Sequence, residues 1–212
     1  MPSFVPSPPY DGFPEIPGDP PVLGILASGS GSNFETIANC VERGDLEADI
    51  SCLVCNNPGA RCLDRAERLG VPSTVINHRD YDDRSEFDVE IVEHLKSRDV
   101  EWVVMAGWMR IVTSTFIDAY RERIVNLHPS ILPAFRGVQA VDDALEAGVK
   151  MTGCTVHTVT EEVDAGPIIA QAAVPVRADD DHDSLIERIH EAEHWIFPRA
   201  IADAVAQTRT KT

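Results

Sequence analysis

Short apolar runs alternate with segments of helical spacing along most of this chain, and that alternation limits the folds open to it. Val22–Ala27 is a continuous apolar run, and apolar residues then recur at helical spacing over 33–43 before Gly44. The same pattern predicts strands at 50–55, 72–76, 103–106 and 124–128, with helices at 61–69, 84–96 and 113–120. Such a βαβ sequence predicts an α/β fold of three layers, a mostly parallel sheet with helices on both faces.

The two ends of the chain depart from this rhythm. A helix near 141–147 precedes two longer strands at 151–160 and 167–176, and a final helix is predicted over about 184–205. Residues 1–20 are dense in proline, which favours an extended or disordered arm that stays outside the core. We therefore expect an N-terminal arm at 1–20 and one folded domain at 21–212.

Composition narrows the classes of function. The chain has 35 acidic and 18 basic residues and a formal net charge of −17, so its surface repels nucleic-acid phosphates and we expect no nucleic-acid partner. There is no basic, apolar leader and no apolar stretch long enough to span a bilayer, so we expect no membrane association. The odd count of 5 cysteines fits free thiols in a reducing cytoplasm. Because Cys52 and Cys55 lie within an apolar run and no second pair completes a zinc set, no metal is expected.

Asn126 and His128 lie two residues apart at the end of a predicted strand, so their side chains should point to the same side. Pro129 ends that strand at the carboxyl edge of the sheet, where open α/β sheets bind ligands. Asp164 follows in an Asp-Ala-Gly-Pro segment. An amide, an imidazole and a carboxylate together suit stabilisation of an oxyanion and transfer of a proton. Taken singly, His128 could be a hydrogen-bonded structural residue and Asp164 a turn residue.

A Ser/Gly loop follows the first predicted strand and leads into a helix. Gly31 permits close backbone approach, and Ser32 and Asn33 can cap the helix, whose free N–H groups attract an anion. Phe34 stands where a dinucleotide-binding fingerprint has its third glycine, so a single phosphate monoester suits the loop better. A tight turn without a ligand is the alternative.

Several stretches, read together, carry a family resemblance: LASGSGSNFE, AGWMRIV, NLHPSILPAF, GCTVHTV, EEVDAGPII and the Glu193-His194 pair, in this order from about Val22 to Pro198. This ordered set resembles the phosphoribosylglycinamide formyltransferases, folate-dependent enzymes of purine synthesis. The resemblance implies a Rossmann-like formyltransferase fold and makes 21–212 the catalytic domain. It also implies two small-molecule substrates, glycinamide ribonucleotide and 10-formyltetrahydrofolate as formyl donor, with a cytoplasmic monomer or homodimer as the acting species.

By similarity, site residues transfer onto matching positions of this chain. Catalysis would rest on Asn126, His128 and Asp164, with Asp164 expected to raise the pKa of His128. The ribotide phosphate would be held by Gly31, Ser32 and Asn33, with Glu193 on the sugar side. The folate would contact Arg84, Met109, Arg110, Ile111, Val112 and Asn126.

Other readings remain open. Formyltetrahydrofolate hydrolase and methionyl-tRNA formyltransferase share the fold and the catalytic trio, but usually carry an additional domain before or after it, for which this sequence leaves no room. Pro129 also resembles the ribotide enzymes. Arg136 departs from some of them, so no substrate contact is assigned to 136–141. A binding module from another class would use the glycine loop alone and tolerate changes in the trio, and an oxidoreductase would need a nicotinamide site.

Overall fold

One sheet of eight strands forms the centre of the protein in a computed structural model that describes residues 3–211. Its strands lie in the order β1-β8-β7-β6-β5-β2-β3-β4. The strands are β1 Val5–Ser7, β2 Val22–Ala27, β3 Asp49–Cys55, β4 Ser73–Val75, β5 Trp102–Met105, β6 Ile124–His128, β7 Met151–Thr158 and β8 Ile168–Pro175. The helices are α1 Ser32–Glu42, α2 Arg61–Arg68, α3 Arg84–Lys96, α4 Ser114–Ala119, α5 Ala140–Glu146 and α6 His182–Thr210, with a short 3₁₀ turn η1 at His78–Asp80.

The five strands β4, β3, β2, β5 and β6 are parallel, and β7, β8 and β1 continue the sheet antiparallel. This confirms the α/β prediction of a mostly parallel sheet with helices on both faces. Most predicted elements agree with the structure to within two residues. Helix α6 runs five residues further than predicted, to Thr210, because its last turn is held by polar contacts rather than by apolar spacing: Arg209 Nη1 donates to the carbonyl of Pro17 at 2.8 Å.

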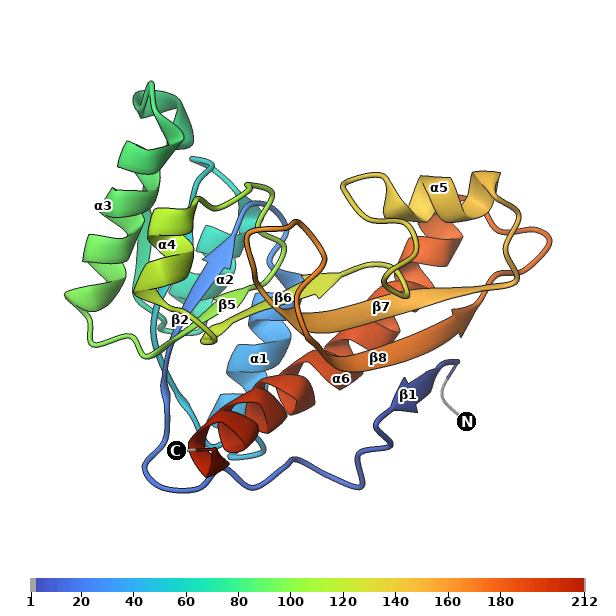
Figure 1. Cartoon of the computed structure of the whole chain (residues 1–212), viewed down its shortest axis with the longest axis horizontal. Helices are drawn as coiled ribbons and strands as arrows, with labels where there is room; N and C mark the ends of the chain where they lie inside the picture. Colours follow the sequence, from blue (N-terminus) through green and yellow to red (C-terminus); the bar gives the residue numbers. More distant parts are fainter. Residues whose placement is uncertain (1–2, 212) are drawn as a thin grey trace.

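Two apolar clusters fill the space between the sheet and its helices. One joins α1, α2 and α6 to one face, and the other joins α3 and α4 to the opposite face (Figure 1). Successive strand residues alternate between them, as Cys52 and Cys55 show: Cys52 packs under α3 and Cys55 under α1 and α2. All five cysteines are buried and free, so the Cys-x-x-Cys run is strand packing. No helix in residues 3–211 combines the length and apolar composition needed to cross a membrane.

The order of the strands creates a crevice at the carboxyl ends of β2 and β5. The chain proceeds from β2 outward to β3 and β4, and then returns to place β5 on the other side of β2. The loops that follow β2 and β5 therefore diverge. Open α/β sheets usually bind their ligands at the point where two such loops diverge. They remain joined at their start, since Ser28 N–H donates to the Gly107 carbonyl at 3.0 Å.

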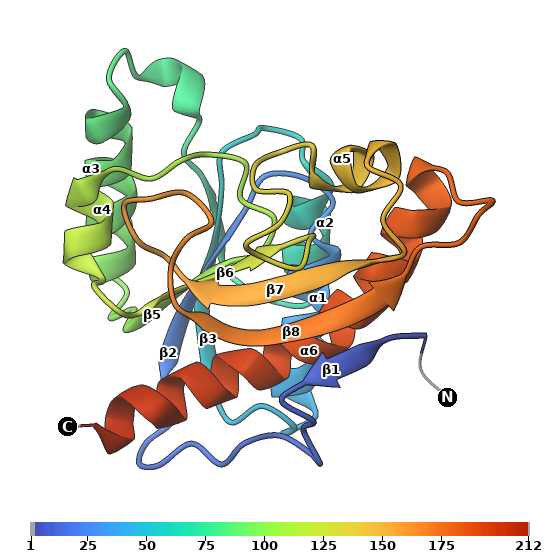
Figure 2. The same cartoon turned by 45° about the vertical axis from the view of Figure 1, so that its right-hand side comes forward.

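The N-terminal arm differs from the expectation of a disordered segment outside the core. Strand β1 pairs antiparallel with β8, and the arm continues past α6 to β2 (Figure 2). Phe4 and Ile16 are 8% and 5% exposed and belong to the main apolar cluster. Residues 1 and 2 of the predicted arm lie outside the described part of the chain.

Aromatic contacts explain why a proline-rich segment docks. Phe4 and Tyr10 lie against the Trp195 ring of α6, with centroids 5.6 and 6.2 Å away, and the Tyr10 hydroxyl donates to Asp203 at 2.9 Å. The Arg199 guanidinium lies over the rings of Phe13 and Trp195. Prolines keep the arm extended, which lowers the entropy that docking must overcome.

Phe4→Ala should therefore weaken docking of the arm. A terminal segment can detach without unfolding the domain. We therefore expect the free energy of unfolding to fall by about 1–3 kcal/mol, which is less than the usual loss when a fully enclosed phenylalanine is replaced by alanine. Urea unfolding and amide exchange of residues 5–7 measure it. The matched control is Val5→Ala. Val5 is 67% exposed, so this change should lower the free energy of unfolding by less than about 0.5 kcal/mol. Equal losses for the two variants would show that the aromatic contact does not hold the arm.

Candidate active site

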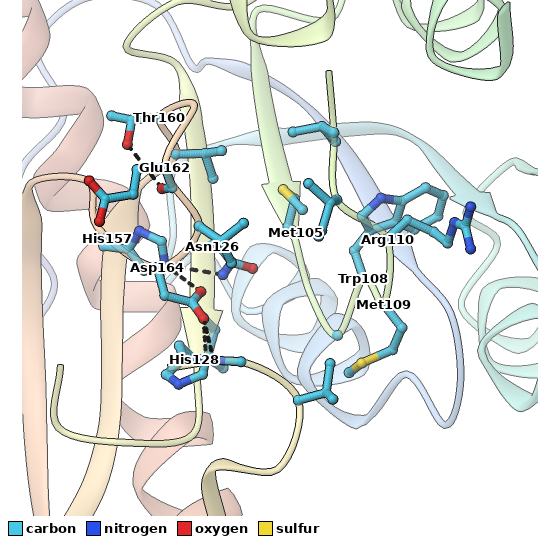
Figure 3. A pocket seen from close by; sticks show the side chains of 18 of the residues that line it. Met105, Trp108, Met109, Arg110, Asn126, His128, His157, Thr160, Glu162 and Asp164 are labelled. Atoms are coloured by element: carbon cyan, nitrogen blue, oxygen red, sulfur yellow. Dashed lines mark hydrogen bonds and ion pairs between the residues drawn. The ribbon is translucent and has the colours of Figure 1, made fainter. Parts of the chain in front are cut away.

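A cavity of about 240 Å³ opens at the carboxyl end of β5 and β6. Figure 3 shows the polar side chains Asn126, His128, His157 and Asp164 gathered on one wall, and Met105, Trp108 and Met109 across from them. The structure thus brings the three residues predicted as catalytic into one cavity, although Asp164 lies 36 positions beyond His128 in the numbering.

Strand β6 presents Asn126 and His128 on the same side, and it ends at His128 because Pro129 has no backbone N–H. The His128 ring makes two polar contacts. Its Nε2 lies 2.8 Å from the Phe135 carbonyl, and its Nδ1 lies 3.3 Å from Asp164 Oδ2. A carbonyl oxygen accepts only, so Nε2 carries a proton. The two contacts hold the ring in one orientation, with a proton at the site.

Asp164 lies on the loop between β7 and β8, with a left-handed φ of 52° that aspartate tolerates better than most residues. Oδ2 accepts from the Gly137 N–H at 2.9 Å, and the side chain is 9% exposed. Burial alone would raise the pKa of Asp164, but the His157 ring, the Gly137 amide and the His128 ring outweigh it and hold that pKa below its usual range. Asp164 is therefore a carboxylate at neutral pH.

His157 of β7 completes the polar wall. It pairs with Asn126 across the two strands, and its Nε2 lies 3.1 Å from Asn126 Nδ2 and 3.7 Å from Asp164 Oδ1. Nδ1 faces the Thr158 carbonyl at 3.1 Å, so it carries the proton and Nε2 accepts from the Asn126 amide. That bond orients the Asn126 amide and leaves its second N–H for another acceptor. A histidine within an apolar strand marks His157, from sequence, as a buried hydrogen-bonded residue or a support for the site, and its contacts with Asn126 and Asp164 fit the supporting place.

The loop after β5 forms the apolar wall. Met109, Arg110, Ile111 and Val112 all line the cavity, as predicted for a folate site, and Met109 and Ile111 are 67% and 54% exposed. Val138 and Val163 line the other side, and Val138 is 91% exposed. Sequence reasoning missed them because exposed valines in loops carry no periodic signal. Exposed apolar residues gathered round a cavity are typical of a binding site.

Arg84 is the one predicted folate residue that does not line the cavity. It is the first residue of α3 and exposed to solvent, and its charge opposes the rise in the pKa of the buried Asp88. Its assignment stays a prediction.

Gly31 begins α1 as its cap, with φ 73°, and the helix has no side-chain cap. The expectation that Ser32 or Asn33 caps the helix is wrong, because both residues already lie within it and the Asn33 side chain donates to Glu193 instead. A Cβ on Gly31 would lie 2.5 Å from Cys62 Cβ, so α2 packs directly against the loop and leaves room only for glycine. Phe34, which stands in place of the third glycine, is fully buried.

Asn33 and Glu193 meet on the other side of the loop. Asn33 Nδ2 donates to Glu193 Oε2 at 2.9 Å across 160 positions of sequence. Asn33 Oδ1 and His194 Nε2 are buried without a hydrogen-bond partner among the described residues. Such polar atoms beside a helix N-terminus suit a polar, anionic ligand. Nowhere in residues 3–211 do three or more His, Cys, Asp or Glu side chains gather as a metal site would require.

Comparison with known proteins decides the family. A family model described as "Formyl transferase" matches residues 23–201, which is most of the chain. The chain belongs to the formyl transferase family. The N-terminal arm lies outside the matched region.

Individual relatives agree with this assignment. The phosphoribosylglycinamide formyltransferase of Bacillus subtilis is 41% identical over 177 residues, covering 84% of this chain and 91% of that protein. The trifunctional purine biosynthetic protein adenosine-3 of Drosophila melanogaster is 45% identical over 188 residues, but the matched part is 88% of this chain and only 14% of that protein.

Solved structures give the same result. The glycinamide ribonucleotide transformylase 1 of Symbiobacterium toebii superposes with a TM-score of 0.86 at 42% identity, covering 87% of each chain. The corresponding protein of Geobacillus kaustophilus gives 0.83 at 43% identity, covering 89% of this chain and 98% of the other. The predicted fold family is thereby confirmed.

Glu193 should make the stability of this formyl transferase depend on pH. Burial raises the pKa of Glu193 to about 7 from an ordinary value of 4.5, despite the Asn33 bond. The folded state then binds the proton more tightly than the unfolded state, so stability falls as pH rises from 4.5 to 7. Glu193→Gln cannot ionise, so its stability relative to the wild type should rise by about 3 kcal/mol as pH increases from below 4.5 to above 7.

Urea unfolding at about pH 5 and pH 8 measures the difference, since the two conditions lie on either side of the transition. The neighbouring Glu191→Gln, at an exposed position, serves as control and should shift stability equally at both pH values. A Glu193→Gln variant whose stability relative to the wild type does not change with pH would contradict burial of the charge.

Proposed function

We propose that this protein transfers the formyl group of 10-formyltetrahydrofolate to the amine of glycinamide ribonucleotide, N1-(5-phospho-D-ribosyl)glycinamide. In this proposal it serves de novo purine (IMP) synthesis and one-carbon metabolism in the cytoplasm, where its five free cysteines stay reduced. The observation that carries the proposal is the gathering of Asn126, His128 and Asp164 in one cavity with the apolar wall after β5. A hydrogen bond from Ser28 to Gly107 joins that wall to the loop at the start of α1.

The division of the crevice matches the two substrates. The loop at Gly31 offers backbone N–H groups at a helix N-terminus, which suit a phosphate monoester. Glu193 and Asn33 lie beside it and suit the hydroxyl groups of a ribose. Met109, Ile111 and Val112 offer an apolar surface for a flat pterin ring. The polar wall lines the same cavity as the apolar surface, which is where the formyl group would meet the amine.

The chemistry follows from the residue types. The neutral amine attacks the formyl carbon, and the carbonyl oxygen becomes an oxyanion in a tetrahedral intermediate. The second N–H of the Asn126 amide is free to donate to that charge, and His128 can join it by exchanging its Nε2 bond to the Phe135 carbonyl for one to the oxyanion. Asp164 orients the His128 ring through its contact with Nδ1. His157 fixes the Asn126 amide so that its free N–H needs no reorientation during the reaction.

The reaction also requires one proton to leave the attacking amine and another to reach the departing folate nitrogen. The ionised Asp164 is the base nearest to His128, and the pair can pass a proton between them, directly or through a held water. When the C–N bond to the folate breaks, the formyl group remains on the glycinamide nitrogen and tetrahydrofolate leaves.

The direct test follows release of tetrahydrofolate from 10-formyltetrahydrofolate with and without glycinamide ribonucleotide. We predict release only when the ribotide is present. Equal release without the ribotide would instead identify a formyltetrahydrofolate hydrolase, a reaction open to the same fold.

His128→Ala should lower kcat about 10²–10³-fold, because it removes one oxyanion donor. Circular dichroism and the unfolding midpoint establish that the variant is folded. The matched control is His182→Ala, an exposed histidine paired with Asp142 at the start of α6, which should turn over at the wild-type rate. Turnover of His128→Ala within a few-fold of the control would contradict the mechanism.

A further inference from the structure

Two consecutive residues of α3 hold the apolar wall at its two ends. Near the start of the wall the Phe87 ring stacks on the Trp108 ring, with centroids 6.1 Å apart and planes 2° from parallel. At its end the Thr113 N–H donates to Asp88 Oδ2 at 2.6 Å. The segment between them carries Met109 and Ile111, which face the cavity (Figure 3 shows Met109 and Arg110).

Asp88 occupies an unusual place for a carboxylate. It is 1% exposed and lies on the buried side of α3 with Ile91, Val92 and Leu95, where an apolar residue would pack better. Burying a charge there is unfavourable unless something requires it. Burial raises the pKa of Asp88, while the Thr113 N–H and the charges of Arg84 and Arg110 oppose that rise. The short bond to Thr113 is thus the main contact that the buried carboxylate gains.

The bond acts on the wall rather than on the helix that carries Asp88. Thr113 is the residue before α4 and follows Val112, the last residue of the wall. Because Asp88 belongs to a helix packed on the sheet, it fixes the end of the wall against the core. The start of the wall is fixed separately, since Met109 N–H donates to Ser28 Oγ at 2.9 Å.

We propose that Asp88 is a positioning residue for the formyl folate: by accepting the Thr113 N–H, it holds the 107–113 segment in the shape that the pterin ring contacts. This inference rests on the proposed function. It predicts that losing the acceptor weakens the folate site while the ribotide site, built on α1 and α6, stays intact.

The test compares Asp88→Ala with Asp88→Asn. The alanine variant has no acceptor and leaves the Thr113 N–H without its partner, so KM for 10-formyltetrahydrofolate should rise about tenfold or more. The asparagine variant keeps a carbonyl oxygen that can accept the same N–H, so its KM should stay within about threefold of the wild type. KM for the ribotide should change less than about twofold in both.

Asp180→Asn is the stability control. Its side chain is also little exposed, at 3%, but its carboxylate pairs with Arg188 near the start of α6 rather than with the wall. It should lower the unfolding midpoint without raising KM for the folate. Hydrogen exchange supplies a second readout, because the Thr113 amide should exchange faster in Asp88→Ala and not in Asp180→Asn.

Three results would overturn the inference. One is an unchanged folate KM in Asp88→Ala, another is an equal rise in the ribotide KM, and the third is an asparagine variant as impaired as the alanine variant. Failure of the proposed function is distinguishable, because the wild type itself would then show no ribotide-dependent formyl transfer. Direct titration of each variant with 10-formyltetrahydrofolate would still report whether Asp88 shapes its site.

Discussion

The buried carboxylate of Asp164 connects three segments that are distant in the sequence. It contacts His128 at the end of β6, approaches His157 on β7, and accepts the Gly137 N–H from the loop between them. A charge enclosed in this way is stable only when its partners are in place, so the same contacts that shape the loops also fix the polar wall. The proposed chemistry depends on this one cluster, because it sets the orientation of His128.

The topology of the sheet explains why the two halves of the crevice lie together. Strands β2 and β5 are neighbours, yet the chain leaves them in different directions, toward α1 and toward the 107–113 segment. Ser28 joins the two loops by accepting from Met109 and donating to Gly107. The loop at the start of α1 and the apolar wall are therefore joined by hydrogen bonds where they begin.

The features that could be predicted from the sequence are those that depend on neighbouring residues along the chain. Alternation of apolar residues gave the sheet and its helices, and Pro129 gave the end of β6 beside Asn126 and His128. Contacts that depend on folding were missed. The arm docks through Phe4 on Trp195, a pairing that no local pattern encodes. Sequence reasoning also missed Asp88, although an acidic residue on the apolar side of a helix, with Ile91 and Leu95, indicates a specific role for its carboxylate.

The central claim is that Asp164 works through His128, and a double-mutant cycle on kcat tests it most directly. His128→Ala, Asp164→Asn and the double variant are compared with the wild type at a pH where Asp164 is ionised. If the two residues act as one unit, the double variant loses little more than His128→Ala alone. Losses that multiply, so that the double variant falls by the product of the two single effects, would contradict the account.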